Sequence, residues 1–291
     1  MLVDKPAGVS SHDVVAIARR SLHEKRIGHA GTLDPFATGL LILLLGRATR
    51  LMRYVRDEPK IYEAIVKFGA ETDTEDPSGT VVREAPLPSR EALERAALAF
   101  VGTIDQVPPA FSAKQVDGER SYDLARAGRA VALAPVAVTI HECALSAFEE
   151  TASGVSRCAM RVSCAGGTYV RSIARDLARA AASAAHLTDL RRVSAGGFFA
   201  AQAFSLESLQ SGAVSVAPPI AALDGYPAQG ITPEEIVSAG RGMTIEARVD
   251  GGYASLIDES ARAPRRLVAF GERVRSESGD RWQPRVVMRD A

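Results

Sequence analysis

Alternating apolar and polar residues along the chain predict several β-strands. The clearest stretch, IYEAIVKFG at 61–69, puts four residues on one face: Tyr62, Ala64, Val66 and Phe68. Further strands are expected at 2–4, 136–149 and 155–165. The uninterrupted apolar run LLILLLG at 40–46 is typical of a buried strand.

Apolar residues spaced by three and four predict helices between these strands. Ser10 or Ser11 is a suitable cap for a helix whose apolar face carries Val14, Ile17, Ala18 and Leu22. Three more helices are expected at about 47–57, at 89–101 behind a Ser89 cap, and at about 170–181. In the last of these, Arg171, Arg175 and Arg179 share one face, which by pattern alone is typical of a solvent-exposed surface.

The C-terminal part has a different pattern of apolar residues. Four short apolar stretches separated by Gly, Asp and Pro predict a compact β-rich module of about 65 residues. We therefore expect an α+β protein with a mixed, largely antiparallel sheet flanked by helices in residues 1–225, and a small β-rich domain in residues 226–291. The segment 107–135 mixes prolines, charges and small residues and is long for a simple connection, which favours a functional loop.

Composition narrows the class of protein. The 291 residues are 46% hydrophobic, and no apolar run reaches the ~18 residues of a membrane span. The chain start, MLVDKPAGVSSHDVV, lacks the basic and long apolar segments of a signal peptide, so we expect a soluble cytoplasmic protein without a membrane partner. The three cysteines, Cys143, Cys158 and Cys164, have neither the spacing of a zinc site nor an even count for disulfides, and we expect the last two at buried strand positions.

Charge gives a weaker signal about partners. The 35 basic and 35 acidic residues cancel, so overall electrostatics does not indicate a nucleic acid. Only five of the basic residues are lysine, and arginine suits bidentate contacts to phosphate better. Codon bias of a GC-rich genome, consistent with the complete absence of asparagine, explains the same preference.

The glycine-rich stretch GHAGTLDPFATG at 28–39 is the strongest candidate for chemistry. It lacks the spacing of a P-loop, of a dinucleotide-binding turn and of a hydrolase elbow. His29 and Asp34 alone are too few ligands for a metal. A glycosidase would need a second acid, for which sequence distance alone suggests Asp57, Glu58 or Glu63. What remains is one carboxylate, Asp34, in a constrained Asp-Pro turn, which by itself is more typical of a structural turn.

The motifs taken together carry a family resemblance. GHAGTLDPFATGLL resembles the catalytic motif of the TruB-type tRNA pseudouridine synthases, and LVDKPAGVSSHDVV, KIYEAIVKFGAETDTEDPSG, GGTYVRSIARDLA and LTDLRRVSAGGF resemble further family motifs in the right order. APRRLVAF lies where the family has a small PUA RNA-binding domain. The resemblance implies a pseudouridine synthase fold, a PUA-like C-terminal domain, and isomerisation of uridine 55 in the TΨC loop of tRNA. It also implies no cofactor, no metal and no DNA partner, and nothing in the sequence requires more than a monomer.

The resemblance assigns the central chemistry to Asp34. The family's essential aspartate, to which Asp34 corresponds, acts on the ribose, either as a nucleophile at C1′ or as a base at C2′, and the sequence leaves both open. Arg171 corresponds to the cation that holds this carboxylate in its charged form. The glycosidic bond N1–C1′ is broken and a C5–C1′ bond is formed.

Four further residues are expected to surround the target base, which must be flipped out of its stack. Tyr62 corresponds to the family tyrosine that stacks on the base and assists removal of the C5 proton, and Tyr169 to a second pocket tyrosine. His29 corresponds to the histidine that fills the space left by the flipped base. Leu190 corresponds to an apolar wall of the uracil pocket.

The resemblance also suggests where RNA is held. The segment near 107–135 corresponds to a thumb-like insertion whose possible RNA contacts are Phe111, Lys114, Arg120, Arg126 and Arg129. Arg191 and Arg192 are expected close to backbone phosphates, and Lys5 with Pro6 is expected to act as scaffold near the site. Two other functions stay open: a non-catalytic tRNA-binding or folding chaperone, and a nucleoside hydrolase that uses a carboxylate pair.

Overall fold

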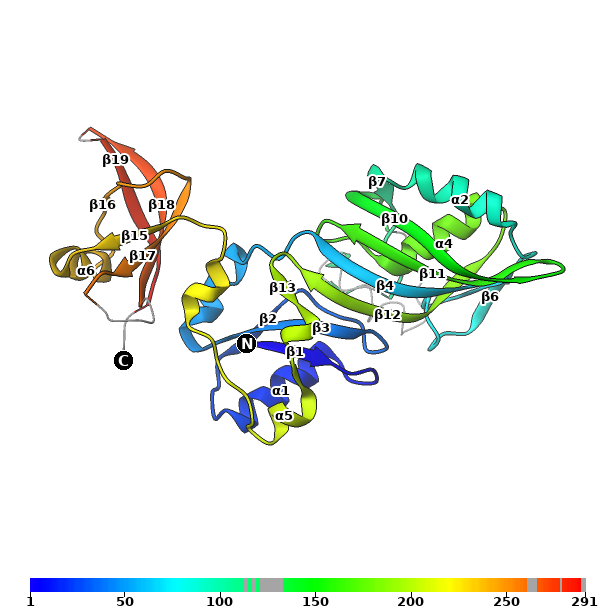
Figure 1. Ribbon diagram of the computed structural model, residues 1–291, viewed down its shortest axis with the longest axis horizontal. Coiled ribbons are helices and arrows are strands. Elements are labelled where there is room, and N and C mark those ends of the chain that lie inside the picture. The colour runs from blue at the N-terminus through cyan, green and yellow to red at the C-terminus, as the bar shows by residue number, and fades with distance from the viewer. Residues whose placement is uncertain (112–114, 117–118, 121–132, 261–265, 278, 289–291) are drawn as a thin grey trace.

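The structure, a computed structural model, describes residues 1–111, 115–116, 119–120, 133–260, 266–277 and 279–288. Figure 1 shows an elongated molecule with a large sheet at one end and a smaller sheet at the other. The side chains expected to contact RNA at Lys114, Arg120, Arg126 and Arg129 lie outside the described part of the chain. Of the predicted thumb-like insertion, only the first and last residues and two short paired strands, β8 (Gln115–Val116) and β9 (Glu119–Arg120), are described.

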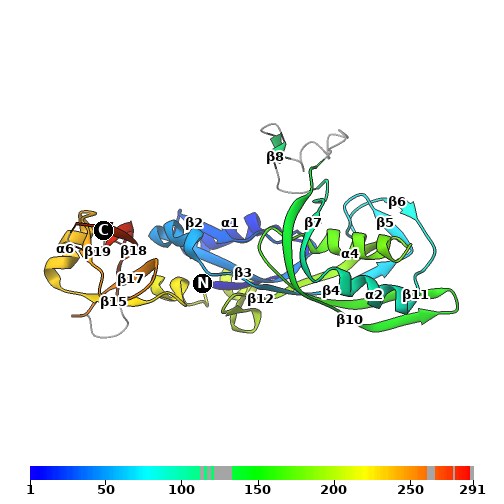
Figure 2. The ribbon, with the colours of Figure 1, turned by 90° about the horizontal axis from the view of Figure 1, so that it is seen from above.

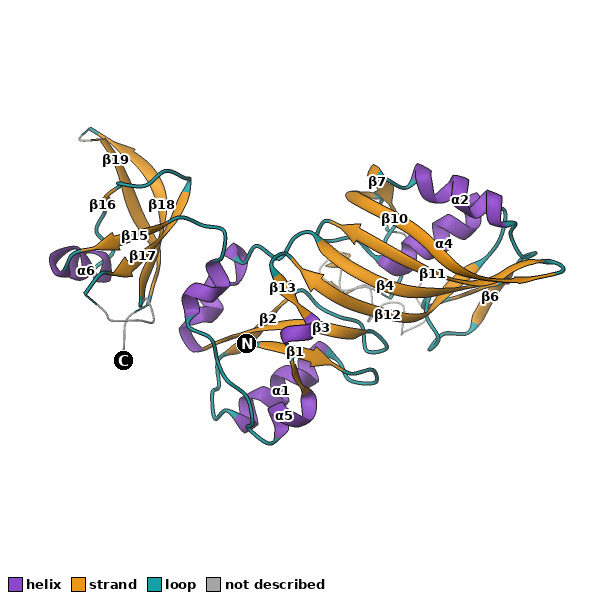
Figure 3. Ribbon diagram, viewed as in Figure 1, coloured by secondary structure: helices purple, strands orange, loops and turns teal. Residues whose placement is uncertain are grey.

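The large sheet contains ten strands, and eight of them follow the spatial order β14-β1-β3-β12-β4-β11-β10-β7. Their bounds are β1 Leu2–Lys5, β2 Ile27–Ala30, β3 Thr38–Leu45, β4 Lys60–Phe68, β7 Gly102–Gln106, β10 Val136–Thr151, β11 Gly154–Cys164, β12 Ala185–Ala195, β13 Phe198–Phe199 and β14 Phe204–Ser205. Only the pairs β1–β14 and β12–β3 are parallel. The predicted α+β fold with a mixed, largely antiparallel sheet is therefore confirmed, and Figure 3 shows its helices beside the sheet.

One face of the large sheet is covered by α2 (Arg90–Ala99) and α4 (Val170–Ala180). The strict alternation in β4 sends Tyr62, Ala64, Val66 and Phe68 into this core, as predicted. Neighbouring β11 adds Cys158, Met160, Val162 and Cys164, each no more than 1% exposed. Figure 2 shows α4 and α1 (Ser11–Ser21) on the same side of the sheet.

The apolar strand β3 is buried on both faces. Leu41 and Leu43 pack with α1 and α5 (Leu206–Gln210). The alternate residues Leu40, Ile42 and Leu44 point to a second core that also contains Leu267, Phe270 and Val286 of the C-terminal sheet. The helix α1 begins with a capping box in which Ser10 and Asp13 exchange hydrogen bonds, so Ser10 is the cap.

The C-terminal sheet has five strands in the order β15-β17-β18-β19-β16. Their bounds are β15 Ala228–Ile231, β16 Ile245–Glu246, β17 Tyr253–Asp258, β18 Leu267–Ser276 and β19 Gly279–Val287, with α6 (Pro233–Gly240) beside them. The core contains the fully buried Trp282, whose indole N–H donates to Gln229 at 2.7 Å. The predicted β-rich C-terminal domain is confirmed, whereas β15 and α6 were not predicted; the boundary at 225/226 stays a prediction.

Several elements differ from the sequence prediction. The stretch at 46–54 is a 3-10 helix, η1 (Gly46–Tyr54), in place of the expected amphipathic α-helix. The turn-rich segment after β4 contains a small hairpin, β5 (Ala70–Thr72) and β6 (Val81–Glu84). Strand β12, central in the sheet, was not predicted. The short helices η2 (Ala200–Gln202) and η3 (Pro219–Leu223) complete the fold, and no helix in the described ranges is long and apolar enough to cross a membrane.

The burial of all three thiols generates a prediction about their reactivity. Burial raises the pKa of Cys158 to about 12 and that of Cys143 and Cys164 to about 11, so almost no reactive thiolate exists at pH 8. We expect the folded protein to react negligibly with Ellman's reagent at pH 8, while the protein in denaturant releases one equivalent per cysteine. Rapid reaction of a thiol under native conditions, without loss of the folded circular-dichroism signal, would contradict the packing of β10 and β11.

Candidate active site

The glycine-rich loop between β2 and β3 is held mainly by side chains from other elements. The hydroxyl of Ser11 accepts a hydrogen bond from the Leu33 N–H at 2.9 Å and donates one to the Leu33 carbonyl at 3.0 Å. Lys5 Nζ donates to the Pro35 carbonyl at 3.2 Å, and Arg192 Nη2 donates to the Gly31 carbonyl at 3.0 Å. Anchors thus lie on both sides of Asp34, which fixes the direction of its side chain.

Glycine is required where this loop meets β12. Gly39 has φ +102° and pairs with Arg192 across the parallel strands. A Cβ at Gly39 would lie 2.3 Å from the carbonyl oxygen of Arg192, far inside van der Waals contact. The absence of a side chain therefore permits the close approach that brings the loop against β12.

Asp34 and Arg171 form the central ion pair of the site. Arg171 Nε lies 2.8 Å from Asp34 Oδ2, and the side chains are 4% and 34% exposed, respectively. The same guanidinium donates to the carbonyls of Thr74 at 2.8 Å and Phe111 at 3.1 Å. Arg171 is therefore oriented by two backbone groups while it neutralises a carboxylate that stays accessible from outside.

The arginines of α4 are not a solvated face, contrary to what their spacing alone suggested. Arg171 and Arg175 are 3% and 7% exposed, and the side chain of Arg179 is half exposed. Arg175 pairs with the buried Glu75, and Arg179 pairs with Glu71 at 2.6 Å. Arg175 also contacts its neighbour Asp176 at 2.7 Å. Every arginine of this face thus meets at least one acid, and the acids of Arg175 and Arg179 come in part from the segment after β4, which folds back over the helix.

The pKa shifts of Glu71 and Arg179 show how this ion pair stays charged. Burial opposes ionisation of Glu71, but hydrogen bonds from Arg179 and Arg83 prevail and lower its pKa. The hydrogen bond from Glu71 in turn raises the pKa of Arg179. Both partners therefore stay charged at neutral pH, and the segment carrying Thr74 is fixed next to Arg171.

Arg191 and Arg192, both expected near phosphates, have different surroundings on β12. Arg191 makes a bidentate contact with Asp4 at 2.7 and 2.9 Å. Arg192 is 1% exposed and donates through Nε to the Leu40 carbonyl at 2.8 Å, besides its contact with Gly31. The prediction is wrong for Arg192, because adjacent residues of a strand point to opposite faces and Arg192 points inward. For Arg191, whose side chain is 41% exposed, it stays a prediction.

Tyr62 lies beside Arg192 in the interior. Its ring is 7% exposed, and the two residues are directly paired between β4 and β12. Burial raises the pKa of Tyr62, against the attraction of Arg192, so the phenol is protonated at neutral pH. A ring and a hydroxyl hydrogen are therefore available here, whereas a phenolate is disfavoured.

His29, on β2, lies close enough to Arg192 for their charges to interact. Burial lowers its pKa, so the imidazole is neutral, and its Nδ1 is buried without a hydrogen-bond partner among the described residues. The ring of His12 approaches it edge-on, with 6.1 Å between centroids.

Tyr169 and Leu190 come from the start of α4 and from β12. Tyr169 caps α4, and both its N–H and its carbonyl are bonded to the side chain of Gln106, at 2.9 and 3.1 Å. Leu190, on β12, shares the core cluster of Tyr62 and lines a cavity of about 530 Å³ together with Phe36 and Thr38. Asp34 and Arg171 do not line that cavity.

Lys5 was expected only as scaffold, and the structure gives it a stronger place. It is fully buried, and its Nζ also donates to the carbonyls of Pro6 and Val9, at 3.0 and 2.8 Å. Burial lowers its pKa to about 8, while the charge of Asp34 acts in the opposite direction. The ammonium therefore persists at neutral pH and adds positive charge beneath the loop.

The acids that a carboxylate-pair hydrolase would need are bound elsewhere. Asp57 pairs with Lys60 at 3.0 Å, and Glu63 pairs with Arg161 at 3.2 Å. Glu58 accepts a hydrogen bond from the Gly166 N–H at 2.7 Å. Asp34 is thus paired with a cation and not with a second acid. In the described ranges, no three His, Cys, Asp or Glu side chains are grouped as metal ligands.

Solved structures share this architecture. A chain in the structure of an H/ACA RNP bound to a substrate RNA containing 2′-deoxyuridine aligns with a TM-score of 0.70 and 19% identity, over 99% of this chain and 84% of that one. A chain of the archaeal box H/ACA sRNP Nop10–Cbf5 complex aligns with a TM-score of 0.68 and 21% identity, over 98% and 84%. These likenesses confirm the predicted pseudouridine synthase fold.

Proteins found by sequence comparison share a much higher identity with this chain than these solved structures do. The protein named tRNA pseudouridine synthase B of Solibacter usitatus is 46% identical over 213 residues, 72% of this chain and 71% of that protein. The protein of the same name from Azoarcus sp. is 40% identical over 257 residues, 86% and 84% of the two chains. Residues 19–170 match the N-terminal domain of the TruB family pseudouridylate synthases. With its glycine loop, ion pair and fold in agreement, the chain belongs to the TruB family of pseudouridylate synthases.

Proposed function

We propose that this chain is a tRNA pseudouridine synthase that converts uridine 55 in the TΨC loop of tRNA. The observation that supports this most strongly is the pair of Asp34 with the buried Arg171 at the end of a rigid loop, in a member of the TruB family. The named relatives are tRNA pseudouridine synthases. In the reaction the N1–C1′ bond breaks, a C5–C1′ bond forms, and the proton of C5 is replaced by one on N1.

In this proposal Asp34 is the catalytic residue. Its accessible carboxylate acts on the ribose of the flipped nucleotide, at C1′ as a nucleophile or at C2′ as a base. Both routes need the Asp34 oxygen to be ionised and oriented. The charge of Arg171 favours the ionised form, and its fixed guanidinium orients the carboxylate. A purely tRNA-binding chaperone has no use for such a pair, and a nucleoside hydrolase of the carboxylate-pair type would need a second acid.

The residues around the ion pair would bind the flipped uridine. Tyr62 stacks on the base and assists loss of the C5 proton, and Tyr169 forms another side of the pocket. His29 occupies the space that the base leaves. Leu190 forms an apolar wall. Stacking on an aromatic ring is worth roughly 1–3 kcal/mol per base, which offsets part of the cost of flipping.

The proposal extends to the rest of the chain. Residues 1–225 form the catalytic domain, with the insertion at about 107–135 gripping the RNA, and residues 226–291 form a PUA-like RNA-binding domain. The enzyme works as a monomer without cofactor, since one chain carries every group named here. Acting on tRNA, it would be located in the cytoplasm.

Replacing Asp34 by Asn tests the catalytic proposal. Asn keeps the size of the side chain but removes the charge, so pseudouridine formation should be abolished while tRNA binding is largely kept. The measurement is mass spectrometry of tRNA after chemical tagging of pseudouridine, since isomerisation alone leaves the mass unchanged. Asp105→Asn, at an exposed carboxylate of β7, is the matched control and should have wild-type activity.

Two outcomes would contradict this assignment. Undiminished conversion by Asp34→Asn would remove the carboxylate from the mechanism. Wild-type protein that binds tRNA without converting it would favour the chaperone, and release of free uracil would favour a hydrolase.

Replacing Arg171 by Lys tests the orientation of Asp34. Lysine keeps the positive charge but is unable to bond Asp34 and the carbonyls of Thr74 and Phe111 together. Because a misplacement of about 1 Å costs on the order of 100-fold in rate, kcat should fall by about that factor with a smaller change in KM. Arg95→Lys, at an exposed arginine of the neighbouring helix α2, should leave kcat unchanged; an equal loss in both variants would indicate a general effect of replacing arginine by lysine.

Replacing Tyr62 by Phe separates the ring from the hydroxyl. If the hydroxyl assists removal of the C5 proton, this variant should show a primary isotope effect on kcat with tRNA deuterated at C5 of uridine. Tyr62→Leu should in addition raise KM, because the stacking surface is lost. A Phe variant with wild-type kcat and no isotope effect would leave the hydroxyl without a role in the reaction.

A further inference from the structure

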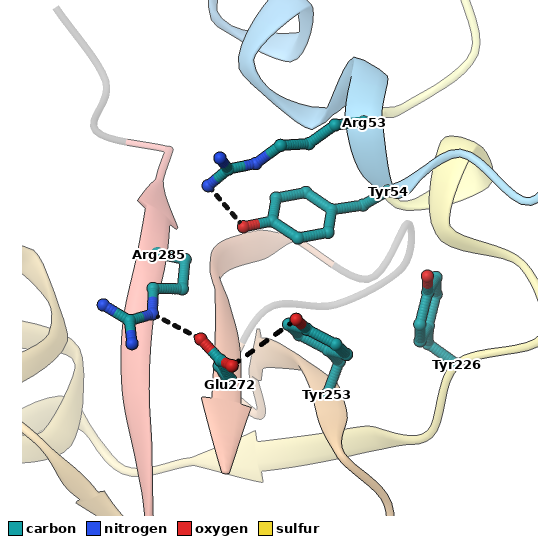
Figure 4. A pocket seen from close by; sticks show the side chains of 6 residues that line it. All are labelled: Arg53, Tyr54, Tyr226, Tyr253, Glu272 and Arg285. Carbon is teal, nitrogen blue, oxygen red and sulfur yellow. Dashed lines mark hydrogen bonds and ion pairs between the residues drawn. The ribbon is translucent and has the colours of Figure 1, made fainter. Parts of the chain in front are cut away.

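A cleft of about 480 Å³ lies between η1 and the C-terminal sheet, away from the candidate active site (Figure 4). It is lined by Arg53 and Tyr54 of η1, by Tyr226 before β15, and by residues of three C-terminal strands: Tyr253, Glu272 and Arg285. Figure 4 shows the three tyrosine rings and the Glu272–Arg285 pair around one open space. The volume suits one nucleotide-sized group.

The aromatic content of this cleft is unusual for the chain. Only six tyrosines occur among the 291 residues, and three of them lie here. All three rings pack on the fully buried Phe270, with centroid distances of 4.8 Å for Tyr54, 4.9 Å for Tyr226 and 5.6 Å for Tyr253. Tyr226 and Tyr253 stay partly exposed. The cleft therefore offers aromatic surface on a rigid floor, which is the arrangement on which unpaired bases stack.

The charge of the cleft comes from η1. In a 3-10 helix residues three apart lie above one another, so Arg47, Arg50 and Arg53 form one row, which Arg56 continues just beyond the helix. None of the four has a carboxylate within salt-bridge distance in the part of the chain that the structure describes, although many other arginines of the chain do.

Inside the cleft, Arg285 is neutralised by Glu272 at 2.7 Å, whereas Arg53 donates only to the Tyr54 hydroxyl, also at 2.7 Å. The exposed row of η1 is thus a strip of uncompensated positive charge that leads to the tyrosines, in a chain of zero net charge. Phosphate groups are the anions that such an arginine row suits.

We propose that the tyrosine cleft and the arginine row of η1 bind an unpaired RNA nucleotide, with its base on the partly exposed Tyr253 and its neighbouring phosphates along Arg53 and Arg50. The inference rests on the proposed function in that the substrate is RNA. The cleft is a second contact, separate from the flipped uridine, and it gives the junction of the two sheets a role in RNA affinity. A protein partner would not explain why unpaired arginines and stacking surface occur together.

Binding of a fluorescein-labelled single-stranded RNA, a hexamer of adenosine, tests this directly. Tyr253→Leu should weaken binding by about fivefold or more, since one stacked base is lost, while Tyr253→Phe should keep wild-type affinity. Arg53→Gln, at an exposed position, should reduce the slope of log K against log salt by roughly 0.7 per phosphate released. Arg95→Gln, at an exposed arginine of α2, is the matched control. It should change neither the affinity for the hexamer nor the salt slope.

The KM for full-length tRNA completes the test and keeps the two proposals distinguishable. Tyr253→Leu and Arg53→Gln should raise this KM and leave kcat unchanged. The cleft assignment would be overturned if both variants kept the wild-type values of the hexamer affinity, the salt slope and the KM for tRNA, even if uridine is converted normally. Hexamer binding that these variants weaken, by a protein that converts no uridine, would instead uphold the cleft and refute the proposed function.

Discussion

The contact between Asp34 and Arg171 is possible only because the loop that carries Asp34 has almost no freedom. Ser11, Lys5 and Arg192 reach this loop from α1, β1 and β12, and each bonds a main-chain group within five residues of Asp34. Lys5 and Arg192, the two buried cations among them, donate their hydrogen bonds to backbone carbonyl oxygens and not to carboxylates. The result is a carboxylate whose position is set before any substrate arrives, which is the arrangement that favours rate over mere affinity.

Charge in this protein is organised locally although the chain as a whole is neutral. Two acids after β4, Glu71 and Glu75, pair with Arg179 and Arg175 of α4 and fix the helix, while Arg171 remains for Asp34. Buried ion pairs seldom add much stability, because desolvation offsets their attraction. Their value here is geometric: they fix the backbone carbonyl of Thr74, which orients the Arg171 guanidinium.

The sequence was sufficient for elements whose pattern is local. The alternation in β4 and the apolar run of β3 gave correct strands, and Ser10 and Ser89 gave correct helix starts. It failed where tertiary contacts decide. Strand β12 has no clean alternation, since two register shifts interrupt its pairing with β4. The burial of Arg175 and Arg192 depends on partners distant in sequence, and η1 became a 3-10 helix although its spacing also fits an α-helix. Asp34, His29, Tyr62, Tyr169, Arg171 and Leu190 were found through motif resemblance, whereas the anchoring role of Arg192 has no local signature.

The apolar cluster on the second face of β3 has a consequence for how the protein unfolds. Leu40, Ile42 and Leu44 share one apolar cluster with Leu267, Phe270 and Val286, so the last strands of the chain complete the interior of the first ones. Heat or denaturant should therefore melt both sheets in a single cooperative transition. Shortening the chain before residue 267 would uncover the apolar residues of η1, among them Tyr54, whose ring packs on Phe270 at 4.8 Å, and would yield an aggregation-prone fragment. The C-terminal sheet is therefore a poor candidate for a detachable domain.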